Sequence, residues 1–155
     1  MMKYLVGFGL AFISFFSSAK YLELDSGLLG LESEYFYIEY NCMKRGAEYF
    51  EYTTQFDMGE IPRVHKFTQD TRIPKNCRQF STKSYKRGKG EKPTYDRGHE
   101  IEQNVVDHSL EAMKLSNRFT NIVPQVAKLN RTGPWRQTEI LTECYRDIGK
   151  LTVMG

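Results

Sequence analysis

Short runs of aromatic and aliphatic residues in the first half of the chain predict β-strands. Residues 35–40 and 49–56 have strand composition, and residues 63–68 form a third candidate. Residues 20–34 contain leucine and glutamate without a clear period, so we interpret 20–40 as a lead-in segment. The stretch 69–94 is polar and basic and holds two prolines and two glycines, which indicates a long loop. Loops of that length in compact domains are usually functional or disordered.

Helical signals appear in the second half. Asp107 or Ser109 can cap a helix over residues 110–118, because short polar side chains favour the position before a helix. Residues 119–123 then return to strand composition, and we expect that strand to end at Pro124.

A second helix is predicted from Pro134 to about residue 148, since proline favours the first turn of a helix. Its apolar residues fall at i, i+3, i+4 and i+7 and predict one buried stripe, formed by Leu141, Cys144, Tyr145 and Ile148. Glu139 and Glu143 lie on a different face of the same helix. Residues 151–154 predict a last short strand.

The N-terminus has the pattern of a secretory signal peptide. A lysine at position 3 precedes an apolar run over 5–16, and small residues follow at 17–19. A membrane-spanning helix needs roughly 20 apolar residues, so an uncleaved anchor is the less favoured alternative. We therefore expect 1–19 to be removed, the protein to be secreted or periplasmic without a membrane segment after cleavage, and 41–155 to form one domain.

Export makes the three cysteines candidates for disulfide chemistry. Cys42, Cys77 and Cys144 are an odd number, so one is left over, and the sequence leaves the pairing open. A zinc site on these cysteines is disfavoured, because there is no Cys-x-x-Cys pair and no histidine at ligand spacing.

Charge is unevenly distributed beneath the overall net charge of +3. Residues 20–61 hold 3 Lys or Arg against 9 Asp or Glu, whereas residues 62–97 hold 11 against 3. Such a basic block is either a solvated loop or a surface for polyanions. Its position directly before the motif at 95–99 favours a polyanion.

Tyr95-Asp96-Arg97-Gly98-His99 is the strongest candidate for chemistry. An ordinary histidine is largely neutral at physiological pH and can accept a proton from water. The glycine before it allows close approach of a substrate, and Arg97 offers a planar fork suited to a phosphate. Asp96 would hold a backbone turn or the arginine. Taken alone, the motif also fits a surface turn.

Asn130 and Glu139 are candidate groups for a divalent metal. Mg²⁺ prefers oxygen ligands and keeps several waters, so one amide oxygen can suffice on the protein side. Asn130 is equally compatible with a turn or cap, and Glu139 with a solvent-facing helix position. We expect Trp135, the only tryptophan, to pack in the core.

Together, Tyr-Asp-Arg-Gly-His at 95–99, Thr-Asn-Ile-Val-Pro-Gln at 120–125 and the Leu-Asn, Trp and Glu at 129–139 resemble the DNA/RNA non-specific endonucleases. These belong to the ββα-metal, or His-Me finger, superfamily, and Glu-Cys-Tyr-Arg-Asp at 143–147 is similar to the secreted bacterial branch. The resemblance implies an α+β fold in which an antiparallel sheet carries a ββα-metal finger, with the active site between a hairpin and a helix. It also implies that the C-terminal part of the family domain is missing here.

The resemblance implies a role for each matching residue. His99 would be the general base, Asn130 the direct ligand of Mg²⁺ (with Mn²⁺ possible), and Glu139 would position water on the metal. Arg97 would lie near the phosphate, and Asn121 would steer the imidazole. The substrates would be DNA and RNA, cleaved without sequence preference to give 5′-phosphate ends.

Upstream basic residues would complete the nucleic-acid contacts. The family uses an upstream arginine against the scissile phosphate, for which we choose Arg78, with Arg72 as the alternative. The expected nucleic-acid-binding set comprises Arg72, Arg78, Lys83, Lys86, Arg87 and Arg97.

Two departures leave alternatives open. Glu100 and Glu102 stand where the family has apolar residues, and they would repel a phosphate or raise the pKa of His99. One extra residue before Trp135 would rotate Glu139 away from the metal. A non-catalytic polyanion-binding relative is therefore the main alternative, and a nuclease completed by a partner is the second.

Overall fold

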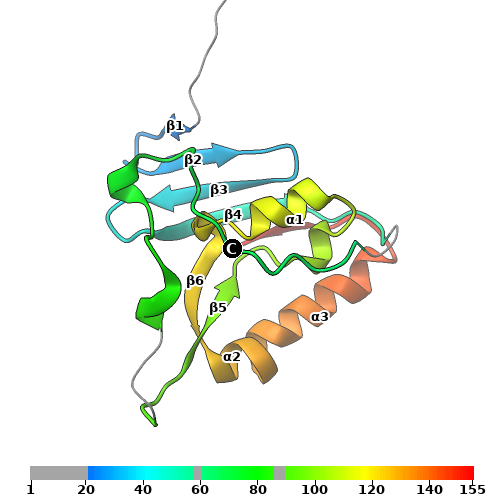
Figure 1. Cartoon of the computed structure of the whole chain (residues 1–155). Helices are drawn as coiled ribbons and strands as arrows, with labels where there is room; N and C mark the ends of the chain where they lie inside the picture. The colour runs from blue at the N-terminus through cyan, green and yellow to red at the C-terminus, as the bar shows by residue number, and fades with distance from the viewer. Residues whose placement is uncertain (1–20, 58–60, 86–89) are drawn as a thin grey trace, which may run out of the picture.

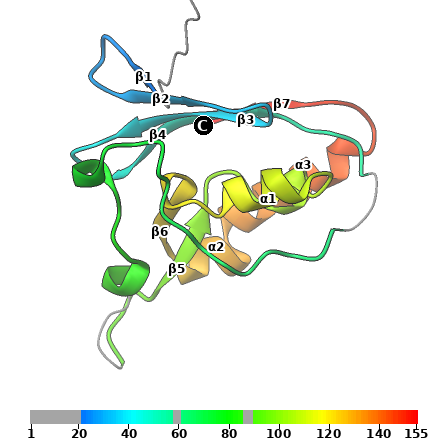
Figure 2. The ribbon, with the colours of Figure 1, turned by 45° about the horizontal axis from the view of Figure 1, so that its top comes forward.

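The computed structural model describes residues 21–57, 61–85 and 90–155 (Figure 1). In this part of the chain, a five-stranded sheet forms one layer, and helices with a two-stranded ribbon form the other (Figure 2). The predicted signal peptide and the candidate contacts Lys86 and Arg87 lie outside the described residues. The predicted α+β class with antiparallel sheets is confirmed.

The main sheet is antiparallel throughout, in the order β1-β2-β3-β4-β7. Its strands are β1 (Leu22–Glu23), β2 (Leu29–Glu32), β3 (Phe36–Asn41), β4 (Gly46–Thr53) and β7 (Thr152–Met154). The strands predicted at 35–40, 49–56 and 151–154 are thus confirmed to within a few residues.

Alternation along the two central strands builds the core. Ile38 and Tyr40 in β3, and Phe50 and Tyr52 in β4, point to the buried face. Successive side chains in a strand point to opposite faces, so the residues between them are only half-buried. The buried face lies against the helical layer (Figure 2).

Two predicted segments differ from the structure. The segment interpreted as a lead-in contains β1 and β2, and Leu29 and Leu31 are buried in the core. Residues 63–68 form no strand and are limited to a single bridge between Thr68 and Arg118. Both misreadings have the same cause, because local composition does not reveal which extended segments find a partner strand.

The second layer begins with the ribbon of β5 (Tyr95–His99) and β6 (Ile122–Val126). Its helices are α1 (Leu110–Ser116), α2 (Ala127–Thr132) and α3 (Pro134–Arg146). Short 3-10 helices cover Lys75–Cys77, Thr82–Tyr85, Asn104–Val106 and Phe119–Asn121. None of the helices in the described part of the chain is long and apolar enough to cross a membrane.

Local signals set the ends of these elements only in part. Ser109 caps α1, and its hydroxyl oxygen accepts a hydrogen bond from the Ala112 N–H. Pro124 lies inside β6, although we expected the strand to end there. A two-stranded ribbon leaves one edge of each strand unpaired, so a proline without an N–H is tolerated in it.

Helix α3 begins at Pro134 as predicted, but the face that it buries is not the predicted one. Leu141, Tyr145 and Ile148 from the predicted buried stripe are 55%, 54% and 76% exposed, and Cys144 is exposed as well. Thr142 and Arg146 face the interior instead. Arg146 donates hydrogen bonds to the Asn104 carbonyl and to Asp107, so ion pairing and backbone contacts override the apolar pattern. Trp135 packs against the core, as expected.

A disulfide joins Cys42 to Cys77, and Cys144 is free. The bond ties the turn between β3 and β4 to the 3-10 helix at 75–77. Cross-links of this kind typically stabilise a fold by about 2–4 kcal/mol. The disulfide thereby fixes the basic loop to the main sheet at Cys77.

Candidate active site around His99

The β5–β6 ribbon presents the central motif. His99 pairs with Ile122, Gly98 with Val123 and Asp96 with Gln125. The side chain of Gln125 crosses directly over Gly98, where any Cβ atom would collide with it. The glycine is needed for this close approach of Gln125, rather than for the close approach of a substrate that we expected.

A cavity of about 600 Å³ lies between the ribbon and the helices α2 and α3. Three of its charged or polar walls carry predicted site residues: β5 supplies Arg97 and His99, α2 supplies Asn130, and α3 supplies Glu139. The remaining wall comes from the segment 63–67 and the turn 102–104. The four strongest candidates from the sequence therefore share one cavity, between a hairpin and a helix as predicted.

A chain of hydrogen bonds fixes the tautomer of His99. The Val64 N–H can only donate, and it donates to Gln103 Oε1 at 3.0 Å. Gln103 Nε2 therefore donates to Asn117 Oδ1 at 2.9 Å, which makes that oxygen an acceptor. His99 Nε2 lies 2.8 Å from the same oxygen and must be the N–H donor. The lone pair of the neutral ring is then on Nδ1, which is the atom able to take a proton.

The surroundings keep this imidazole neutral. Burial lowers the pKa of His99 to about 4, although the hydrogen bond that His99 donates to Asn117 opposes this shift, and the charges of Arg63 and Arg97 lower the pKa further. The ring of Phe67 lies 5.5 Å from the imidazole, centroid to centroid. His99 is therefore unprotonated across the neutral pH range, as a general base must be.

Asn121 does not steer the imidazole, in contrast to our expectation. Its side chain accepts from the Ile101 N–H and donates to the Ile101 and Ser116 carbonyls. It fixes the backbone two residues beyond His99, and Asn117 holds the ring instead. Asn117 and Gln103 were missed, because their roles depend on a contact with Val64 that no local pattern reveals.

Asp96 fixes the orientation of the Asn130 amide. Asn130 Nδ2 donates to Asp96 Oδ2 at 3.1 Å, which leaves the amide oxygen Oδ1 as the available ligand. Arg131 donates to both oxygens of the same carboxylate, at 2.8 and 2.5 Å. Asp96 thus holds Arg131 and Asn130, and not Arg97. The hydrogen bond from Arg131 lowers the pKa of Asp96, so this carboxylate is ionised.

Glu139 stays in the cavity despite the extra residue before Trp135. The hinge is Gly133, where an added Cβ would come within 2.8 Å of the Leu129 backbone. This tight passage lets α3 start immediately beside α2. Arg136 donates to Glu139 at 3.1 Å and so holds the carboxylate at the cavity wall. The extra residue therefore does not remove Glu139 from the cavity that His99 and Asn130 line.

Glu102 is the unusual group in this cavity. It is 8% exposed, and its Oε1 has no hydrogen-bond partner among the described residues. Burial raises its pKa to about 8, and the charges of Glu139 and Glu143 add to that rise. Glu100 is also affected, since burial raises its pKa to about 7. Neither carboxylate raises the pKa of His99, which moves in the opposite direction.

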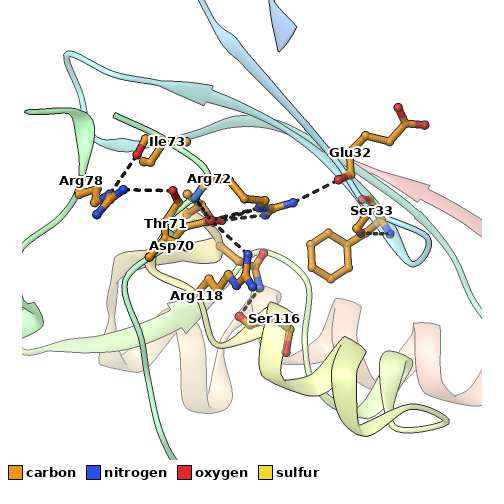
Figure 3. Close-up of polar contacts among 12 residues, drawn as sticks. Glu32, Ser33, Asp70, Thr71, Arg72, Ile73, Arg78, Ser116 and Arg118 are labelled. Carbon is orange, nitrogen blue, oxygen red and sulfur yellow. Dashed lines mark hydrogen bonds and ion pairs between the residues drawn. The ribbon is translucent and has the colours of Figure 1, made fainter. Parts of the chain in front are cut away.

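The upstream arginines lie elsewhere. Arg72 donates to Asp70 and to the Glu32 carbonyl, while Arg78 donates to the carbonyls of Thr71 and Ile73 (Figure 3). These contacts use both guanidinium groups to tie the loop together. Neither arginine is among the residues that line the cavity. Lys83 is exposed on its 3-10 helix, also outside the cavity lining.

Arg63 takes the place that we had assigned to Arg78. It lines the cavity beside Arg97, whose guanidinium stacks 4.2 Å from the centroid of Phe67. The sequence offered a signal in the Arg-Val-His series at 63–65, but our strand prediction for that segment concealed it. Two arginines therefore face the histidine from neighbouring segments.

The donor set fits a hard divalent cation held by few protein ligands. In the described residues, no three His, Cys, Asp or Glu side chains form a cluster that could hold a metal by themselves. Asn130 Oδ1 and the carboxylate of Glu139 belong to side chains that line the same cavity, and both are oxygen donors. Mg²⁺ commonly uses one or two protein oxygens and keeps several waters, so this sparse set suits it.

Comparison with known proteins agrees with this geometry. The sequence model of the DNA/RNA non-specific endonuclease family matches residues 22–154. The chain belongs to that family. A search of curated proteins found no match. The endonuclease fold is also found in a chain of the crystal structure of the EndoG/EndoGI complex, which addresses the mechanism of EndoG inhibition.

That chain and this one align with a TM-score of 0.68 at 18% sequence identity. The alignment covers 81% of the present chain and 51% of the other, so this chain spans about half the length of that relative. At this identity the likeness concerns the fold. In this member of the family, the ribbon β5–β6 followed by α2 and α3 corresponds to the predicted ββα arrangement.

Proposed function

We propose that this chain is a divalent-metal-dependent endonuclease that hydrolyses phosphodiester bonds of DNA and RNA without sequence preference. Its family membership supports a nuclease. The observation that carries the proposal is the fixed tautomer of His99, whose Nδ1 is the basic atom in the same cavity as Asn130 Oδ1. A neutral base next to an oxygen donor for a cation is the minimum required for metal-assisted hydrolysis.

In the proposed reaction, a water molecule gives its proton to His99 Nδ1 and attacks phosphorus in line with the leaving O3′. Asn117 holds the imidazole during proton transfer, because its oxygen stabilises the Nε2–H and the positive ring that forms. Arg97 and Arg63 contact the phosphate oxygens. The departing O3′ takes a proton from solvent water, so bond cleavage leaves a 5′-phosphate and a 3′-hydroxyl, and His99 returns its proton to solvent.

Asn130 Oδ1 and the Glu139 carboxylate would hold Mg²⁺, with Mn²⁺ as a substitute. The bound ion supplies positive charge that neutralises the phosphoryl oxygens during displacement. Asp96 keeps Asn130 in the ligand orientation, and Arg136 keeps Glu139 at the wall. Substrate contacts through phosphates carry no direct sequence information, so binding is expected to be sequence-tolerant and weakened by salt.

We further propose that the protein is secreted or periplasmic. The pattern of residues 1–19 supports export, and so does the disulfide between Cys42 and Cys77. Disulfides are rare in proteins that stay in a reducing cytosol.

Nicking of supercoiled plasmid tests the proposed function. With Mg²⁺ the full chain should nick the plasmid, and EDTA should abolish nicking. His99→Ala should lower the rate by about 10²–10⁴, the usual contribution of a general base. His108→Ala is the matched control, because His108 lies outside the cavity lining, and its rate should stay near that of the parent.

The test also distinguishes a nuclease from the main alternative, a polyanion-binding protein without catalysis. If the folded parent chain and the His99→Ala variant retard the plasmid equally in a gel and neither cuts it, the protein is a polyanion-binding protein. Circular dichroism on each variant confirms folding, so that loss of activity is not mistaken for loss of structure.

A further inference from the structure

A second cavity, of about 570 Å³, borders strand β6 of the β5–β6 ribbon. On the ribbon it is lined by Val123 and Pro124, which pair with Gly98 and Arg97 of the catalytic motif. Lys44 and Arg45 from the β3–β4 turn also line it, with Phe80 from the basic loop. Strand β5 therefore contributes to the first cavity and β6 to the second, and only the first holds the residues of the proposed reaction.

Phe80 presents an aromatic face in this second cavity. Its side chain is 67% exposed, although it lies in a polar and basic segment. The Arg45 guanidinium lies 5.0 Å from the centroid of its ring and also donates to the Asn76 carbonyl. Phe80 and Arg45 therefore lie together in the cavity lining, so that a flat apolar ring is next to a cationic group.

The turn that carries Arg45 is held rigidly. Asn41 Oδ1 accepts hydrogen bonds from the Met43 and Lys44 N–H groups, both at 2.9 Å. Arg45 itself has φ of 54°, an uncommon backbone conformation for a residue other than glycine. The neighbouring disulfide connects this turn to the loop three residues before Phe80. Such a conformation persists only where its surroundings enforce it, and it often marks a functional position.

The loop side of the cavity is fixed to the ribbon as well. Tyr85 donates its hydroxyl hydrogen to Gln79 Oε1 at 2.6 Å. Gln79 Nε2 in turn donates to the Ile122 and Phe119 carbonyls at 2.8 and 3.1 Å. Phe80 follows Gln79 directly, so its backbone is positioned relative to the strand that carries the active site.

We propose that this cavity binds an unpaired nucleobase of a single-stranded nucleic acid, stacked on Phe80 with Arg45 and Lys44 at the adjacent phosphates. The inference rests on the proposed function, since it adds a substrate subsite to the nuclease. Aromatic rings combined with cationic side chains are the usual platform for single strands, and they accept any base because every base has a π face. Within the described part of the chain, Lys44 forms an ion pair with Glu48, and such an exposed pair is weak enough to exchange for phosphate.

The charge of the surroundings selects this occupant. Both charged residues in the cavity lining are cations, and the loop that carries Phe80 belongs to the basic block at 62–97. A polyanion with flat apolar groups matches both the charge and the ring. Bases paired within a duplex are stacked and cannot enter, so the subsite would favour single-stranded over double-stranded substrate.

Binding of two labelled oligonucleotides of equal length, oligo(dT) and its abasic counterpart, tests the proposal by fluorescence anisotropy. EDTA is present, so that binding is measured without cleavage. The abasic strand keeps the phosphates and lacks the bases. Phe80→Ala should weaken oligo(dT) binding at least about fivefold, since stacking on an aromatic residue contributes about 1–3 kcal/mol per base. The same variant should leave binding of the abasic strand unchanged.

Two further variants sharpen the result. Phe80→Trp should restore oligo(dT) affinity, because a larger ring preserves the stacking face. Phe56→Ala removes another exposed phenylalanine, outside both cavities, and should change neither affinity. Equal weakening of both oligonucleotides by Phe80→Ala, no weakening of either, or no binding of oligo(dT) by the parent chain would overturn the subsite.

The proposed function is tested separately by plasmid nicking. Phe80-dependent binding by a chain that never cleaves would support the subsite and refute the nuclease. Cleavage that depends on His99, together with binding that ignores Phe80, would refute the subsite alone.

Discussion

Asp70 and Asp96 both hold arginines, and the two arrangements differ in what they leave unsatisfied. Asp70 is buried and accepts hydrogen bonds from Arg72 and Arg118 (Figure 3), and from Thr120. Asp96 accepts from Arg131 and Asn130 at the edge of the active-site cavity. Around Asp70 the protein supplies the partners. Around Asp96 the network ends at Asn130, whose Oδ1 is the proposed ligand of the cation.

The two networks differ in whether their polar groups are all paired within the protein; we call the network of Asp70 closed and that of Asp96 open. A closed network of buried charges contributes to the fold, and it has no hydrogen-bonding capacity left for a ligand. An open network stabilises the fold less but offers donors and acceptors to a substrate. Two of the arginines that we assigned to phosphate, Arg72 and Arg78, belong to the closed region. Arg97, which we also assigned to phosphate, lines the open region together with Arg63.

The largest effect is expected in the closed region. Asp70→Asn removes the charge between two arginines and should lower the free energy of unfolding by about 3 kcal/mol, the scale for a broken buried ion pair. Urea denaturation measures it, with the exposed Asp147→Asn as a control that should stay within about 0.5 kcal/mol. An unfolding free energy for Asp70→Asn equal to that of the control would contradict the role of this network.

The same substitution in the open region should lower the nicking rate and leave the free energy of unfolding nearly unchanged. Asp96→Asn disturbs the orientation of Asn130 and should slow plasmid nicking about 10–100-fold, as for other groups that orient a metal ligand. Its unfolding free energy should change by less than about 1 kcal/mol, because Arg131 is largely exposed. A variant that loses stability and keeps its nicking rate would remove the distinction between the two aspartates.

The smallest effect concerns pH and the buried carboxylates. Burial alone would raise the pKa of Asp70, but the hydrogen bonds and charge of Arg72 hold it below the ordinary value. Its stabilisation is therefore lost as the pH falls. For Glu102 the folded pKa of about 8 exceeds the ordinary 4.5. Its stabilisation is complete below about pH 4.5 and is lost as the pH rises through 8.

Glu102→Gln should therefore reduce the loss of stability between pH 6 and pH 9. Urea midpoints at both values measure this, with EDTA present. The control is Glu111→Gln on the exposed side of α1, which should show the same pH dependence as the parent. An identical fall in midpoint for Glu102→Gln and the parent would show that Glu102 is ionised in the folded chain at pH 6.

The sequence predicted the central residues of the site better than the residues that surround and orient them. His99, Arg97, Asn130 and Glu139 share one cavity, because the motif that carries them fixes the order of ribbon and helix. Asn117, Gln103 and Arg63 were missed, since their roles come from contacts between segments distant in the chain. A buried amide that orients a histidine has no local signature.

The errors in the fold also follow from long-range contacts. The apolar stripe of α3 was a sound local signal, but Arg146 turns the helix by bonding to Asp107 and to the Asn104 carbonyl. Charge alone did not reveal that Arg72 pairs with Asp70, because an arginine in an internal ion pair and a phosphate-binding arginine look alike in a sequence. The pairing of Cys42 with Cys77 was open for the same reason.

The crossing of Gln125 over Gly98 has an evolutionary consequence. Any side chain at position 98 collides with the side chain of Gln125, so a change at that position requires Gln125 to move away or to be replaced. The two positions lie diagonally across the ribbon, since Gly98 pairs with Val123, and they are 27 residues apart in the chain. Natural variation at these two sites should be correlated, because a smaller residue at position 125 opens the space that a side chain at position 98 needs.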